Sequence, residues 1–278
     1  MLTARFKLSA VLAFGVVQLC ALNVRSQSNP RDVADAPQKY FGPFDAGPSR
    51  FNLSPGNAIP KTAAAPLKTS PLIVVGFMGG RVRPNNFVHQ EASLAAGLQR
   101  DYPGEVHAQV FANRDGKKAY LQILNLLDAD HDGDLTPAEK QNARIIIYGH
   151  SWGASETVSL ARRLGRNGIT VLLTVQVDSI RKKGEEDKYI PANVLQAVNF
   201  YQPSGLLHGR KVIRAVNPEK TQIVGNFRLS YRDHAISCSR YPWFARTFMR
   251  PHIEIENDPQ VWDKVEAMIR ENLPDAGQ

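Results

Sequence analysis

The segment Gly149-His150-Ser151-Trp152-Gly153 places a serine between two glycines in the pattern Gly-x-Ser-x-Gly. Small residues on both sides leave room for a sharp strand-to-helix turn, which lifts the serine hydroxyl above the edge of a sheet. The same turn places the Trp152 amide beside the oxyanion that an attacking serine would create. The pattern therefore predicts Ser151 as a catalytic nucleophile, whereas the plain alternative is a Gly-Ser turn without chemistry.

The residues around this motif alternate between strand and helix patterns. Apolar runs typical of strands of a buried parallel sheet occur at 72–75, 106–111, 145–148, 171–177, 197–201 and 223–231. Amphipathic stretches typical of helices separate them, at about 87–102, 119–127, 155–164 and 258–269. Such alternation predicts βαβ units and an α/β fold with a mostly parallel sheet flanked by helices. We expect one domain, residues 70–278.

Residues 145–154, with the sequence IIIYGHSWGA, resemble the nucleophile region of α/β-hydrolase lipases and esterases, including exported bacterial proteins of that superfamily. The resemblance covers about residues 70–275. It implies an α/β-hydrolase fold, here with a minimal cap because few residues separate 178 from 197. It also implies a Ser-acid-His triad in that chain order and a second oxyanion donor after an earlier strand.

The acid of such a triad is expected where a later strand ends. Asp178 directly follows the strand predicted at 171–177, which is the next strand after the nucleophile. Most α/β hydrolases carry the acid one strand later, but that strand here ends in Asn199-Phe200-Tyr201-Gln202, which contains no carboxylate. Asp178 is therefore the predicted acid, and capping of the following turn is its alternative role.

Three histidines follow Asp178 in the chain. His252 precedes the final helix in an expected loop, which resembles the position of the base in the superfamily. His234 remains a rival because it follows the strand at 223–231 more closely, and His208 is a third candidate. His89 and His107 lack such a context and are interpreted as ordinary surface or core residues.

The second oxyanion donor is predicted from the strand at 72–75, which ends in Gly76-Phe77-Met78-Gly79-Gly80. Glycines allow the backbone to approach a substrate closely. The backbone amide of Phe77 or Met78 is the predicted donor, together with that of Trp152. A glycine-rich turn with no catalytic role is the alternative.

Residues 128–139 match the loop of an EF-hand. Oxygen ligands occur at positions 1, 3, 5 and 12, a glycine at position 6 and an apolar residue at position 8. The predicted ligands of a structural Ca²⁺ are Asp128, Asp130, Asp132, Asp134 (through its carbonyl) and Glu139. Lys140 and the strand that follows leave room for only a very short exiting helix, and an acidic solvated loop is the alternative.

The N-terminal residues predict export. Arg5 and Lys7 precede an apolar run from Leu8 to Leu22, and polar residues follow, which is typical of a signal peptide spanning 1–26. An uncleaved anchor is the alternative. Residues 27–69 are rich in Pro, Gly and Ala and are interpreted as a linker or arm. Only Cys238 remains after cleavage, so no internal disulfide is expected.

The charge and composition favour an enzyme over a nucleic-acid-binding protein. The chain has 278 residues, a net charge of +8 and 22% charged residues, and loss of the signal peptide leaves about +5. Its basic residues are scattered and not interleaved with aromatics, so we expect no nucleic-acid partner. We also expect no stable membrane span after cleavage, while the oligomeric state is not indicated.

The sequence predicts a periplasmic or extracellular hydrolase of small-molecule or lipid esters. We expect no cofactor for catalysis, and the predicted Ca²⁺ would be structural. The alternative is a non-enzymatic, exported calcium-binding protein on an inactive hydrolase scaffold.

Overall fold

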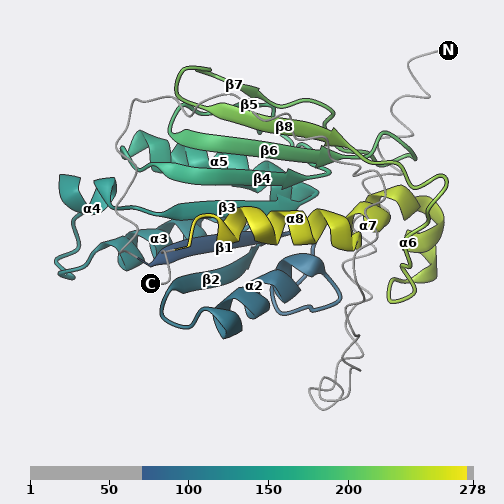
Figure 1. Cartoon of the computed structure of the whole chain (residues 1–278), viewed down its shortest axis with the longest axis horizontal. Coiled ribbons are helices and arrows are strands. Elements are labelled where there is room, and N and C mark those ends of the chain that lie inside the picture. The colour runs from purple at the N-terminus through teal and green to yellow at the C-terminus, as the bar shows by residue number, and fades with distance from the viewer. Residues whose placement is uncertain (1–70, 274–278) are drawn as a thin grey trace.

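A computed structural model describes residues 71–273 of the chain (Figure 1). The predicted signal peptide (1–26) and arm (27–69) lie outside the described residues. Within the described range, strands and helices alternate along the chain as the sequence predicts. None of the described helices is long and apolar enough to cross a membrane.

A six-stranded sheet forms the centre of the fold, and every neighbouring pair of its strands is parallel. Its order is β2 (Val106–Ala112), β1 (Leu72–Met78), β3 (Ile145–His150), β4 (Val171–Val177), β6 (Val194–Tyr201) and β8 (Gln222–Arg228). The arrows of all six strands point to the same side, where α6 and α7 lie (Figure 1). A small parallel pair, β5 (Tyr189–Ile190) with β7 (Arg214–Ala215), lies apart from this sheet.

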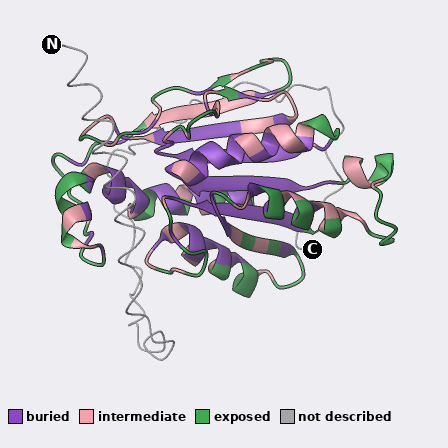
Figure 2. Ribbon diagram, turned by 180° about the vertical axis from the view of Figure 1, so that it is seen from behind, coloured by how far each residue is buried: buried purple, intermediate pink, exposed green. Residues whose placement is uncertain are grey.

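Helices cover both faces of the sheet. On one face lie α2 (Gln90–Asp101) and α8 (Pro259–Arg270), and on the other lie α3 (Gly116–Leu127) and α5 (Trp152–Arg166) (Figure 1). The central strands and the sheet-facing sides of these helices are buried (Figure 2). Three short helices complete the fold: α4 (Pro137–Gln141), α6 (Trp243–Phe248) and α7 (Arg250–Glu256).

The alternating direction of side chains along each strand produces two separate cores. In β1, Leu72 and Val74 pack into the core beneath α2 and α8, whereas Ile73 and Val75 pack into the core beneath α3 and α5. Because helices cover both faces, the central strands β1, β3 and β4 are buried at every position, whereas β2 and β8 at the edges are partly exposed. This explains the continuous apolar runs of the central strands.

The predicted α/β fold class, a mostly parallel sheet flanked by helices, is confirmed. Several boundaries differ from the prediction. Strand β1 extends three residues beyond the predicted end at Val75, because Gly76, Phe77 and Met78 continue to pair with β2. The expected loop around His252 is helix α7.

Candidate active site

Ser151 lies at the turn between β3 and α5, with φ 57° and ψ −121°. This is a strained backbone for a residue with a side chain. Gly149 and Gly153 must be glycines, because a side chain at either position would clash with the backbone. A Cβ on Gly149 would lie 2.6 Å from the carbonyl carbon of Gly153, and a Cβ on Gly153 would lie 2.1 Å from the carbonyl oxygen of Phe77. Trp152 is the first residue of α5, as the motif predicts.

The backbone of the next strand holds this turn in place. The Ser151 amide donates to the carbonyl of Val177 at 3.0 Å, and the amide of Ile180 donates to the Ser151 carbonyl at 3.2 Å. These two hydrogen bonds bracket Asp178 in the chain. The position of the serine is therefore fixed relative to the residue predicted as the acid.

Asp178 is fully buried at the end of β4, with φ 45°. Its Oδ1 accepts hydrogen bonds from the amides of Gly209 at 2.7 Å and Gln202 at 3.2 Å. Its Oδ2 accepts from Gln202 Nε2 at 2.9 Å and lies 2.7 Å from His252 Nδ1. The carboxylate is thus held by four donors, and one of them is an imidazole. The sequence analysis did not identify Gln202 or Gly209 as its partners.

His252 lies in α7 and is 2% exposed. Because its Nδ1 donates to Asp178, the other ring nitrogen, Nε2, is the one available as a proton acceptor. His252 and Ser151 line the same cavity. His234 and His208 are exposed and do not line this cavity. The structure therefore brings Ser151, Asp178 and His252 together.

The cavity has a volume of about 60 Å³, and residues that directly follow the carboxyl ends of β1 and β3 line it. Apolar side chains, including those of Val82, Met249 and Ile253, line much of it. Arg81 and Arg240 lie at its border and are exposed to solvent. A small cavity with an apolar wall suits a short acyl or alkyl group.

The predicted oxyanion residues on β1 lie differently from expectation. Phe77 and Met78 continue strand β1, and their side chains are fully buried. Neither residue lines the cavity. Gly79 and Gly80 border the cavity instead. The Gly79 amide donates to Glu91 Oε1 at 3.2 Å, and Gly80 turns the chain with φ 51°.

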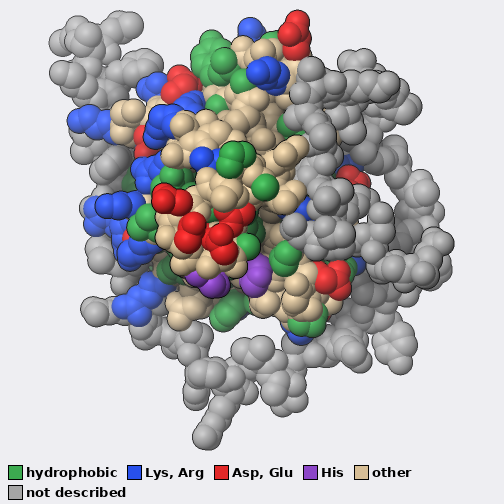
Figure 3. Space-filling model, turned by 90° about the vertical axis from the view of Figure 1, so that its left-hand side faces the viewer, with side chains coloured by type: hydrophobic (Ala, Val, Ile, Leu, Met, Phe, Trp, Pro, Cys, Tyr) green, Lys and Arg blue, Asp and Glu red, His purple; other side chains and the backbone are tan. Residues whose placement is uncertain are grey.

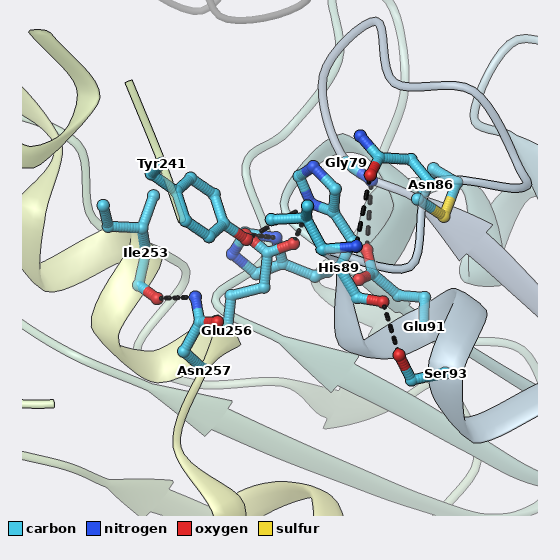
Figure 4. A network of polar contacts seen from close by, with 12 residues as sticks. Gly79, Asn86, His89, Glu91, Ser93, Tyr241, Ile253, Glu256 and Asn257 are labelled. Carbon is cyan, nitrogen blue, oxygen red and sulfur yellow. Dashed lines mark hydrogen bonds and ion pairs between the residues drawn. The ribbon is translucent and has the colours of Figure 1, made fainter. Parts of the chain in front are cut away.

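Next to His252 lies a buried network that the sequence analysis did not predict, part of which is labelled in Figure 4. The ring of His150 packs against that of His252, with centroids 4.4 Å apart, and its Nδ1 lies 3.5 Å from Glu256 Oε2. The other oxygen of Glu256 accepts a hydrogen bond from His89, which also contacts the Tyr241 hydroxyl at 3.3 Å. His89 is therefore not the ordinary residue that its sequence context indicates.

Burial and charge shift the pKa values of this network in opposite directions. Burial lowers the pKa of His150 to about 4, so its ring is neutral at neutral pH. Burial and the nearby Glu256 raise the pKa of Glu91 to about 8. Burial opposes ionisation of Glu256 as well, but His89 and His150 lower its pKa. Glu256 is thus the charged acid of the network, while Glu91 holds a proton at neutral pH.

The predicted calcium loop projects at the other end of the sheet, between α3 and α4. Figure 3 shows this end of the molecule, where acidic side chains gather on the surface. As position 1 of an EF-hand loop requires, Asp128 Oδ2 accepts from the amide of Gly133 at 3.0 Å, and Gly133 turns the chain with φ 91°. Helix α4 has only five residues, as the sequence predicts.

Some of the carboxylates in this loop are placed to bind a hard cation, whereas Glu139 is also engaged in hydrogen bonds within the loop. Oxygens of Asp128, Asp130 and Glu139 lie within 4.8 Å of one another. Asp128 Oδ1 is buried without a hydrogen-bond partner. Glu139, however, also accepts hydrogen bonds from the amides of Ala129 and Thr136, both at 2.8 Å. These bonds lower its pKa, which keeps the carboxylate charged.

Comparison with known proteins found no matching family model and no similar curated protein. Two solved structures are similar in fold. RedJ, with a polyethylene glycol molecule bound in its active site, has 12% identity and a TM-score of 0.39, covering 79% of this chain and 98% of its own. A hyperthermophilic esterase from the archaeon Pyrobaculum calidifontis has 11% identity and a TM-score of 0.36, covering 72% and 78%. Because these values are low, the site's own residues must carry a functional assignment.

Proposed function

We propose that this protein is a serine hydrolase that cleaves carboxylic esters, with Ser151 as nucleophile, His252 as base and Asp178 as the acid that orients the base. One observation carries the proposal: His252 donates to Asp178 at 2.7 Å and lines the cavity that Ser151 also lines. A serine on a strained turn, with a buried imidazole oriented by a carboxylate, is the arrangement required for nucleophilic acyl transfer.

In the proposed reaction, Ser151 Oγ attacks the ester carbonyl carbon while its proton passes to His252 Nε2. Collapse of the tetrahedral intermediate breaks the bond to the alcohol, which leaves with the proton from His252. Water then attacks the acyl-enzyme, giving its proton to His252, and the carboxylic acid product leaves as Ser151 regains a proton. Asp178 orients the ring of His252 and stabilises the imidazolium, and four donors hold its oxygens in place.

The developing oxyanion needs two amide donors. We assign the first to Trp152, at the start of α5, where the helix dipole also favours negative charge. The second donor in the proposal is Gly80, because Phe77 and Met78 lie within β1, whereas Gly80 follows the end of that strand. The Gly79 amide already donates to Glu91.

A fluorophosphonate probe tests the proposal directly, since it labels only an activated serine. We expect stoichiometric labelling of the wild-type protein and none of Ser151→Ala, measured by intact-protein mass spectrometry. Ser155→Ala is the matched control, because Ser155 is buried one turn along α5 and does not line the cavity. Labelling should persist in this control. A folded wild-type protein that is never labelled would instead support the inactive scaffold.

We further propose that the protein is exported through residues 1–26 and that residues 128–139 bind a structural Ca²⁺. The unpartnered, buried Asp128 Oδ1 supports the calcium site. The ion would supply charge neutralisation where acidic side chains crowd together, and would stabilise the connection that leads into β3.

Calcium at about ten times its Kd should stabilise the fold by about 1.4 kcal/mol. For a domain of this size, that corresponds to a rise in Tm of about 3 to 6 °C, measurable by differential scanning fluorimetry. The rise should vanish in Glu139→Gln, which removes the bidentate ligand at position 12, and remain in Glu105→Gln, which removes an exposed acid outside the loop. An equal Tm of the wild-type protein in calcium and in chelator would exclude a calcium-stabilised loop.

A further inference from the structure

A second group of candidate metal ligands lies beside the active-site cavity. It consists of His89, from the segment before α2, Glu91, from the first turn of α2, and Glu256, from the end of α7 (Figure 4). All three are buried, with exposed fractions of 7%, 0% and 2%. Each offers a ligand atom within 4.8 Å of the others. Two acids and a histidine rarely share a dry site unless something balances their charge.

The hydrogen bonds around this group leave two atoms unmatched. The carbonyl oxygen of His252 can only accept, so His150 Nε2, at 3.2 Å, must carry the ring proton. His150 Nδ1 is then a bare lone pair, which lies 3.5 Å from Glu256 Oε2 and has no hydrogen-bond partner. Glu91 Oε2 is also buried without a partner. Two buried polar atoms beside the cavity, His150 Nδ1 and Glu91 Oε2, thus lack a hydrogen-bond partner.

The chemistry of these ligands is consistent with a divalent cation. Without a metal, Glu91 holds a proton and Glu256 is charged. A bound cation displaces the proton of Glu91, and two carboxylates with a neutral imidazole then balance the charge of a divalent ion. A mixed set of one nitrogen and two oxygen ligands suits Zn²⁺ and similar transition metals, whereas Ca²⁺ and Mg²⁺ prefer oxygen alone. His89 and Glu256 line the cavity, so an ion has a path to the site.

We propose that His89, Glu91 and Glu256 form a binding site for one divalent transition-metal ion of the Zn²⁺ class, next to the catalytic serine. The ion takes the place of the proton between His89 and Glu256, and their contact opens to admit it. Through its other oxygen, Glu91 keeps the hydrogen bond from Gly79. Binding of the ion therefore fixes the glycine segment that borders the oxyanion position.

Metal binding to the purified full chain tests this proposal. After chelation, Zn²⁺ is titrated by calorimetry and Co²⁺ by visible absorbance, with calcium in excess to occupy the acidic loop. We expect one equivalent of Zn²⁺, and Co²⁺ bands typical of nitrogen and oxygen ligation. Ser151→Ala should bind the metal equally well, which separates this proposal from the proposed hydrolase function.

Ligand variants localise the site. Glu91→Gln, Glu256→Gln and His89→Gln should each bind Zn²⁺ at least about tenfold more weakly, since even outer contacts of metal ligands contribute that much. Glu254→Gln is the matched control, because Glu254 is buried on the same helix as Glu256 but pairs with Arg250. Absence of binding to the wild-type protein would overturn the proposal, whether or not the variants fold. Binding that survives all three substitutions would overturn it as well.

Discussion

Replacing His252 with alanine should lower kcat for ester hydrolysis by at least about 10⁴-fold, the magnitude associated with loss of a triad histidine. The reason is that His252 is the histidine held by Asp178 and lining the cavity with Ser151. Without it, no base takes the serine proton. The measurement is steady-state hydrolysis of a short-chain nitrophenyl ester, which suits the small cavity.

His234→Ala provides the matched comparison, because the sequence leaves both histidines open as the base. His234 is exposed, so its loss should change kcat by less than about twofold and leave Tm unchanged. A large loss of activity in His234→Ala, with His252→Ala still active, would contradict the proposed triad. Circular dichroism of both variants would show that the difference is chemical rather than structural.

Replacing Gly153 with alanine should lower the free energy of unfolding by about 3 kcal/mol, because the added methyl group would clash with the backbone of β1. Its Cβ would lie 2.1 Å from the Phe77 carbonyl oxygen and 2.9 Å from that of Met78. Both obstacles are backbone atoms of β1, which cannot rotate away as a side chain can. Helix α5 or strand β1 would have to shift, and Ser151 would move with it.

Urea unfolding measures this effect, and Gly97→Ala serves as the control. Gly97 lies in the middle of α2, where an added Cβ would meet only the end of the Arg100 side chain at 3.9 Å. Since alanine favours helix over glycine, Gly97→Ala should be neutral or more stable by up to about 1 kcal/mol. Equal stability of the two variants would show that the contact between α5 and β1 is less rigid than proposed.

The sequence alone was sufficient for the strand-helix alternation, because the central strands β1, β3 and β4 are buried on both faces. The runs 145–148 and 171–177 are therefore largely apolar. The ends of the strands were harder to predict. Gly76 indicates a turn by residue type, yet it continues β1, and a Cβ there would lie 2.6 Å from the Tyr148 ring. Close packing, rather than a turn, requires this glycine.

Some residues of the candidate site could be predicted from the sequence and others could not. Ser151 and Asp178 could be predicted because each directly follows a strand, and parallel strands end at the same edge of the sheet. The network of His89, Glu91 and Glu256 could not, since 167 residues separate its first member from its last. These residues come together only because the end of α7 packs against the residues that precede α2. The spacing of residues along the sequence does not indicate this contact.

The late position of α7 in the chain has a consequence for when the protein can act. The ring of His252 joins Asp178 across 74 residues of sequence, after β6, β8 and α6 have been made. Because α7 follows every strand in the chain, the proposed triad can form only after all six strands have been synthesised. A shorter nascent chain lacks His252, so any activity that depends on this base is absent from it.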